Sequence, residues 1–115
     1  MIQVNAVIAL GASQSNVIDV QNANSLALLI PAAWTAAAIT FLGAEKPTGT
    51  FLPIYDDSEN EISVAVDKIN VSTAISLAAI AEELRPFRYI KLRSGVAATP
   101  VVQEAARTIY VVGKE

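Results

Sequence analysis

The side chains of this chain that are best suited to chemistry are carboxylates, and four of them fall close together: Asp56, Asp57, Glu59 and Glu61. Paired carboxylates can act as general acid and base or hold calcium. The spacing lacks the glycine and the final glutamate that a calcium-binding loop requires. Asp residues also favour tight turns for backbone reasons. We therefore interpret this segment as a solvated hairpin tip, with a metal site and a catalytic pair as the alternatives.

A second cluster combines positive charge with aromatic rings. Its members are Arg85, Phe87, Arg88, Tyr89, Lys91 and Arg93. On a strand, Tyr89, Lys91 and Arg93 would share one face, and such a face can stack bases or bind sugars and phosphates. Glu82 and Glu83 lie close by and offset the charge. We favour an ordinary strand with one solvated face, and keep a partner-protein surface and a nucleic-acid or glycan site as alternatives that use Tyr89, Lys91 and Arg93.

Other common reactive groups are missing. The chain has no histidine and no cysteine, which removes the commonest general base, the commonest zinc ligands and any thiolate nucleophile. The serines have no histidine to activate them, and no glycine loop has the phosphate-binding spacing. We therefore expect no catalytic residue, no cofactor, no metal ion and no enzymatic activity.

The elements that position these residues belong to one short chain. With 115 residues, we expect a single domain spanning residues 1–115. Hydrophobic residues make up 53% and charged residues 17%, so the chain can fill a core and is not a charged disordered tail. The net charge of −3 argues against nucleic acid as the partner, because domains that bind it are usually basic.

Glycine and proline punctuate the chain at short intervals, which indicates many short strands. We predict an all-β fold, an antiparallel β-sandwich of jelly-roll type with about eight strands and one short helix. The predicted strands are 2–10, 17–20, 26–30, 37–42, 50–55, 61–66, 87–93 and 108–112. The predicted helix is 77–84, where Leu77, Ile80, Ala81 and Leu84 recur at helical spacing. Thr73 or Ser76 is expected to cap this helix, and Pro86 to end it.

Residues 25–44 carry no charge over roughly the length of a membrane span. A membrane span would have basic flanks and aromatic residues near its ends, whereas Trp34 lies in the middle and Pro31 interrupts the run. We therefore predict two buried strands joined by a Pro-Ala-Ala-Trp corner and no membrane partner. Trp34 is expected to be a core or corner residue, and a ligand platform is the alternative.

The first strand also lacks charge. Gln3, Asn5 and Val7 are expected to point outward, and Asp19 is the only charged side chain among residues 1–44. An uncharged strand near a chain end does not block pairing with another chain. We predict that residues 1–16 act as a pairing strand or arm, that Val7 lies in an interface, and that the protein is a homo-oligomer.

Three segments together resemble a family of small proteins encoded among the structural genes of tailed bacteriophages and prophages: 29–41 (LIPAAWTAAAITF), 52–57 (LPIYDD) and 87–95 (FRYIKLRSG), the last followed by Pro100 and Ala106-Arg107-Thr108. The predicted strand order is also similar to galactose-binding-like (discoidin-type) sandwiches. The phage resemblance implies a virion component and brings no catalytic residues.

The functional hypothesis combines this resemblance with the composition. We expect a non-enzymatic structural protein of a phage virion, most simply a decoration, cement or surface component of the head, assembled in the host cytoplasm. Its partners would be capsid or other virion proteins. The alternative is a carbohydrate-binding module of a head or tail fibre or spike, with a glycan as partner.

Overall fold

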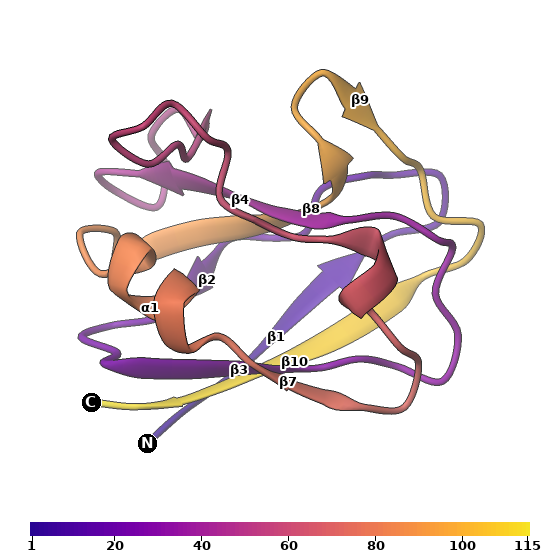
Figure 1. The fold of residues 1–115 in the computed structure, drawn as a ribbon, viewed down its shortest axis with the longest axis horizontal. Helices are drawn as coiled ribbons and strands as arrows, with labels where there is room; N and C mark the ends of the chain where they lie inside the picture. Colours follow the sequence, from indigo (N-terminus) through magenta and orange to yellow (C-terminus); the bar gives the residue numbers. More distant parts are fainter.

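The computed structural model describes residues 1–115, and its main feature is a pair of antiparallel sheets packed face to face (Figure 1). The four-stranded sheet has the order β1, β10, β3, β7. Its strands are β1 (Ile2–Ile8), β10 (Arg107–Lys114), β3 (Ser25–Leu29) and β7 (Ala74–Ser76).

The six-stranded sheet lies across the core from it. Its main path is β2 (Ile18–Asp19), β8 (Tyr89–Val96), β4 (Ile39–Ala44) and β5 (Leu52–Pro53). Two further strands complete it: β6 (Ser63–Val64) pairs with the same edge of β4 as β5 does, and β9 (Thr99–Pro100) forms a hairpin with β8. A glycine is needed in that hairpin, because Gly95 has φ +91 and a Cβ there would lie 2.6 Å from the Thr99 carbonyl oxygen.

The chain passes repeatedly between the two sheets. If β5 and β6 count as one interrupted strand and the small β9 is set aside, eight strand positions remain, with the orders 1-8-3-6 and 2-7-4-5. This is the strand order of a jelly roll, a double-sheet fold of two Greek keys. The predicted all-β sandwich of jelly-roll type is therefore confirmed, with ten strands in place of about eight.

One hydrophobic core fills the space between the sheets. Alternation along the strands turns Ile109 and Val111 of β10 inward, and twenty buried residues form a single cluster. All six residues of β4 are buried because both of its faces are covered. Gly43 makes this possible on the inner side, since a Cβ there would lie 2.6 Å from the Phe87 ring.

The uncharged run of residues 25–44 forms strands, as predicted. It contains β3 in one sheet and β4 in the other, and residues 30–38 make the corner between them. Trp34 is half-buried in this corner, packs against the core and donates its indole N–H to the Ala37 carbonyl at 3.2 Å. The prediction of a core or corner tryptophan is therefore confirmed. None of the helices has the length and apolar character needed to cross a membrane.

The helical segments connect the sheets. A 3-10 helix, η1 (Val66–Lys68), precedes β7, and α1 (Ala78–Leu84) leads from β7 to β8, with Ala81 and Leu84 in the core. The predicted helix is confirmed, but its predicted cap is wrong. The N-cap is Leu77, with no side-chain hydrogen bond, because Ser76 is paired in β7 and the Thr73 hydroxyl donates to the Asn70 carbonyl instead.

Candidate functional site

The five residues predicted to take part in an interaction do not form one site. Val7 lies on the outer face of the four-stranded sheet and is 40% exposed. Tyr89, Lys91 and Arg93 alternate along β8 on the outer side of the other sheet. Trp34 lies in the corner between β3 and β4. The predicted residues are therefore divided between the outer faces of the two sheets and the corner that holds Trp34.

Arg93 is buried, so the prediction that it contributes to an interaction surface is wrong. It is 4% exposed. Its Nη2 lies 2.5 Å from the Glu61 carboxylate, and its Nε donates to the Thr40 hydroxyl at 3.0 Å. Glu61 also accepts a hydrogen bond from the Ala97 backbone N–H in the β8–β9 turn. Arg93 therefore joins β8, β4 and two loops, which is a structural role.

Two further basic groups of this cluster, Arg88 and Lys91, are also engaged individually. Arg88 makes two hydrogen bonds of 3.0 Å to the Asp19 carboxylate, and its guanidinium lies 5.3 Å from the centre of the Tyr89 ring. The hydrogen bond from Arg88 lowers the pKa of Asp19 below its ordinary value. The Lys91 ammonium lies 4.9 Å from the centre of the Phe51 ring. This surface is a set of local pairs with no concentration of free positive charge.

The carboxylates of residues 56–61 serve different purposes. Asp56 Oδ1 accepts hydrogen bonds from the backbone N–H groups of Ser58 and Asn60 at 2.8 and 2.9 Å, which closes the turn. Glu61 points to Arg93. No three carboxylates of the chain lie close enough together to hold a metal ion. The segment has the geometry of a hairpin tip, in agreement with the favoured interpretation.

Sequence reasoning missed a buried glutamine. The Gln103 side chain is fully buried. Its amide oxygen accepts from the Thr35 N–H at 2.9 Å, and its amide nitrogen donates to the Thr35 carbonyl at 3.0 Å and to the Ser94 hydroxyl. Arg107 donates to the same amide oxygen at 3.1 Å. Gln103 fixes the corner after β3 against β8 and β10. A lone glutamine beside Val102 carries no periodic signal that would have identified it.

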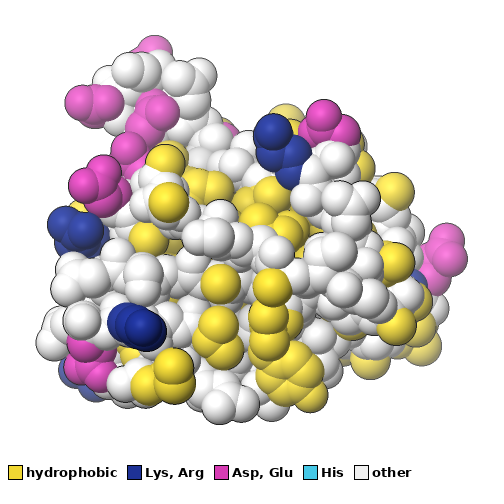
Figure 2. All heavy atoms as spheres, turned by 60° about the horizontal axis from the view of Figure 1, so that its bottom comes forward, with side chains coloured by type: hydrophobic (Ala, Val, Ile, Leu, Met, Phe, Trp, Pro, Cys, Tyr) yellow, Lys and Arg dark blue, Asp and Glu magenta, His cyan; other side chains and the backbone are white.

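The outer face of the four-stranded sheet, here called the uncharged face, is almost free of charge. Its side chains are Gln3, Asn5 and Val7 of β1, Thr108, Tyr110 and Val112 of β10, Ala27 and Leu29 of β3, and Ala74 and Ser76 of β7. Lys114 is the only charged side chain that these strands point outward. In Figure 2 hydrophobic and uncharged side chains cover the lower centre, and charged ones lie toward the margins.

Tyr110 occupies the middle of the uncharged face. The register places Asn5 and Leu29 on either side of it, and Ala74 lies opposite Leu29. Tyr110 is 43% exposed and Val7 40%. An aromatic ring between an amide and an aliphatic side chain, on a surface almost free of charge, has the composition of the centre of a protein–protein interface.

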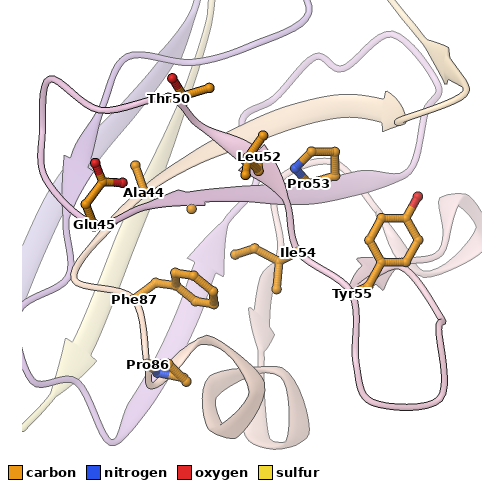
Figure 3. Close-up of a pocket in the computed structure, with 10 residues that line it drawn as sticks. Ala44, Glu45, Thr50, Leu52, Pro53, Ile54, Tyr55, Pro86 and Phe87 are labelled. Atoms are coloured by element: carbon orange, nitrogen blue, oxygen red, sulfur yellow. The ribbon is translucent and has the colours of Figure 1, made fainter.

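A groove of about 500 Å³ lies at the β5 edge of the six-stranded sheet (Figure 3). Phe87 and Ile54 point into it, Tyr55 lies at one end, and Glu45 and Thr50 lie at the other. Leu52 and Tyr55 are both more than half exposed. An apolar floor with a few polar groups at its ends is the usual composition of a small-molecule or sugar site.

No protein-family model matches this chain, and neither a curated protein nor a solved structure does. The uncharged face and the groove are therefore the features of the structure from which a function can be proposed.

Proposed function

We propose that this chain is a non-enzymatic structural protein that is covered by neighbouring subunits through its uncharged face. The single observation that carries the proposal is the absence of charge from the outward positions of four adjacent strands, with Lys114 at the end of β10 as the one exception. A sheet face open to water normally alternates apolar residues inside with charged or polar residues outside. Here the outward residues include Val7, Leu29, Tyr110 and Val112, which water solvates poorly.

The assembly to which these neighbouring subunits belong is, in this proposal, a tailed-phage virion, in which the chain decorates, cements or covers part of the head. This part of the proposal rests on the resemblance of residues 29–41, 52–57 and 87–95. The fold supports it by analogy, since jelly rolls are common in viral capsid domains. Partners are then capsid or other virion proteins and further copies of this chain, and the protein resides in the virion after assembly in the host cytoplasm.

A charge placed on the uncharged face is expected to prevent association. Val7→Lys adds an ammonium to a side chain that is already partly exposed, so the fold should persist while a dry contact would have to desolvate the charge. In sedimentation velocity the wild-type protein should associate equally well at low salt and at about half-molar salt, where charge–charge attraction is screened. The Val7→Lys variant should sediment as the monomer.

Leu52→Lys is the matched control, because Leu52 is exposed on the other sheet. This variant should associate as the wild type does. The proposal is contradicted if Val7→Lys associates normally, or if association of the wild type disappears at high salt, since an anionic partner would then be indicated.

Carbohydrate binding is the second candidate function, and the groove beside Tyr55 and Phe87 is the observation that favours it. Sugars pack on aromatic rings and are oriented by a few polar groups, and Glu45, Thr50 and Tyr55 supply such groups. If the groove holds a glycan, a glycan array should give a signal that Tyr55→Ala loses and Tyr110→Ala keeps. A signal that both variants keep, or no signal from the wild type, contradicts this candidate.

A further inference from the structure

The free edge of β1 offers a short and well-defined set of hydrogen-bonding groups. In the β1–β10 ladder, the N–H and C=O of Val7 point away from β10, because Asn16 binds both of them. Antiparallel pairing alternates, so the backbone groups of Met1, Gln3 and Asn5 point to the same free edge. No hydrogen bond reaches the Gln3 N–H, the Gln3 carbonyl or the Asn5 N–H.

Asn16 marks where this open edge stops. Its side-chain oxygen accepts from the Val7 N–H at 2.7 Å, and its side-chain nitrogen donates to the Asn5 carbonyl at 3.2 Å. Its own backbone N–H donates to the Val7 carbonyl at 3.3 Å. The carboxamide thus occupies the place of a peptide group in a neighbouring strand. The edge is therefore closed from the Asn5 carbonyl to Val7 and open from Met1 to the Asn5 N–H.

We infer that this open edge pairs with the same edge of a second copy of the chain, antiparallel and centred on Gln3. In that register the two Gln3 residues exchange two N–H···O=C bonds. The Asn5 N–H of each copy then donates to the Met1 carbonyl of the other. Four backbone bonds use every open group once, so the edge is complementary to itself. The inference rests on the proposed function and specifies one of its contacts.

The side chains fit this arrangement. Val4 is only half-buried although it packs against the core, and in the proposed register it lies opposite position 2 of the second copy, whose strand would cover its exposed side. Gln3 and Asn5 lie on the uncharged face, so this face would continue across the junction with no like charges opposed. A groove of about 400 Å³ runs along this edge, with Gln3 and Asn5 on one side and Val17 on the other, so the space directly beside the edge is open.

Amide hydrogen exchange of the full chain, followed by NMR from dilute to concentrated solution, tests the pairing. Exchange of the Gln3 and Asn5 amides should slow by about tenfold or more as the protein is concentrated. The Val7 amide, which Asn16 already binds, should be protected at every concentration. Unchanged exchange at Gln3 and Asn5 overturns the inference.

Gln3→Pro is the decisive variant, because proline removes a donor that points only to the free edge. It should abolish the concentration-dependent protection at Asn5, whereas the control Gln3→Thr should keep it. Asn16→Ala leaves the β1–β10 ladder intact and frees the Asn5 carbonyl, which in the proposed register lies opposite the Met1 amino group of the second copy, so this variant should strengthen association. If Gln3→Pro fails to fold, the wild-type exchange and Asn16→Ala still decide the question.

The two proposals fail in different ways. If association survives Gln3→Pro but is lost in Val7→Lys, the uncharged face is confirmed as an interface and the edge pairing is wrong. If association is lost in Gln3→Pro but survives Val7→Lys, the edge pairs and the uncharged face is not the main contact. If concentrated wild-type protein remains monomeric, the edge pairing is wrong, and binding to particles decides the proposed function.

Discussion

Replacing Arg93 with methionine is expected to lower the free energy of unfolding by about 3–5 kcal/mol, because it leaves a nearly buried carboxylate without its partner. Glu61 is largely buried and would keep only the Ala97 N–H, and Thr40 would lose the Arg93 donor. Since small domains are stable by about 5–15 kcal/mol, the variant should unfold at a much lower urea concentration. Equilibrium urea unfolding measures the difference.

Arg88→Met is the matched control for this prediction. Arg88 also pairs with a carboxylate, that of Asp19, but the pair lies at the surface, where water solvates both groups when the pair is broken. Its urea midpoint should stay close to that of the wild type. Equal losses in the two variants would contradict the structural role assigned to Arg93 and would restore it as a candidate for binding.

Deletion of residues 1–11 is expected to abolish cooperative folding. The sequence alone predicts the opposite, a pairing arm whose loss would leave a folded domain that no longer associates, and the burial of β1 contradicts this prediction. In the structure Ile2, Ala6 and Ile8 are at most 1% exposed and belong to the space between the sheets. Burial of the two isoleucines alone contributes about 3–6 kcal/mol, and β10 would also lose one of its two neighbours.

Thermal melting followed by circular dichroism tests the deletion, and two point variants provide its controls. Ile8→Ala should cost about 2–5 kcal/mol, as is usual for a cavity in a core. Leu10→Ala should change little, because Leu10 is exposed after the strand ends. A truncated chain that still melts cooperatively would show that β1 is an arm and not a part of the core.

Much of the fold follows from local patterns. Alternation of apolar residues predicts β1 and β10, and helical spacing predicts α1. For most of the predicted elements, the observed first and last residues lie within two positions of the predicted ones. The short strands β7 and β9 are not predicted. β7 has three residues and β9 has two, which are too few to show alternation. Their strand character comes from pairing with β3 and β8.

Less of the candidate site could be predicted. The lack of charge along β1 is visible in the sequence, but the neighbours that complete the uncharged face come from strands distant in the chain, such as β3 beside β10. The burial of Arg93 depends on Glu61, which lies in a loop 32 positions earlier. Position along a strand identifies the face on which a side chain lies, and only the fold shows what covers that face.

The most direct test of the account is hydroxyl-radical footprinting of two tyrosines in dilute and in concentrated, associated protein. Tyr110, on the uncharged face, and Tyr55, in the groove, are 43% and 52% exposed in the single chain, so both should be oxidised when the protein is dilute. Association should protect Tyr110 and leave the oxidation of Tyr55 unchanged. Protection of Tyr55 with continued oxidation of Tyr110 would contradict the claim that subunits meet through the uncharged face.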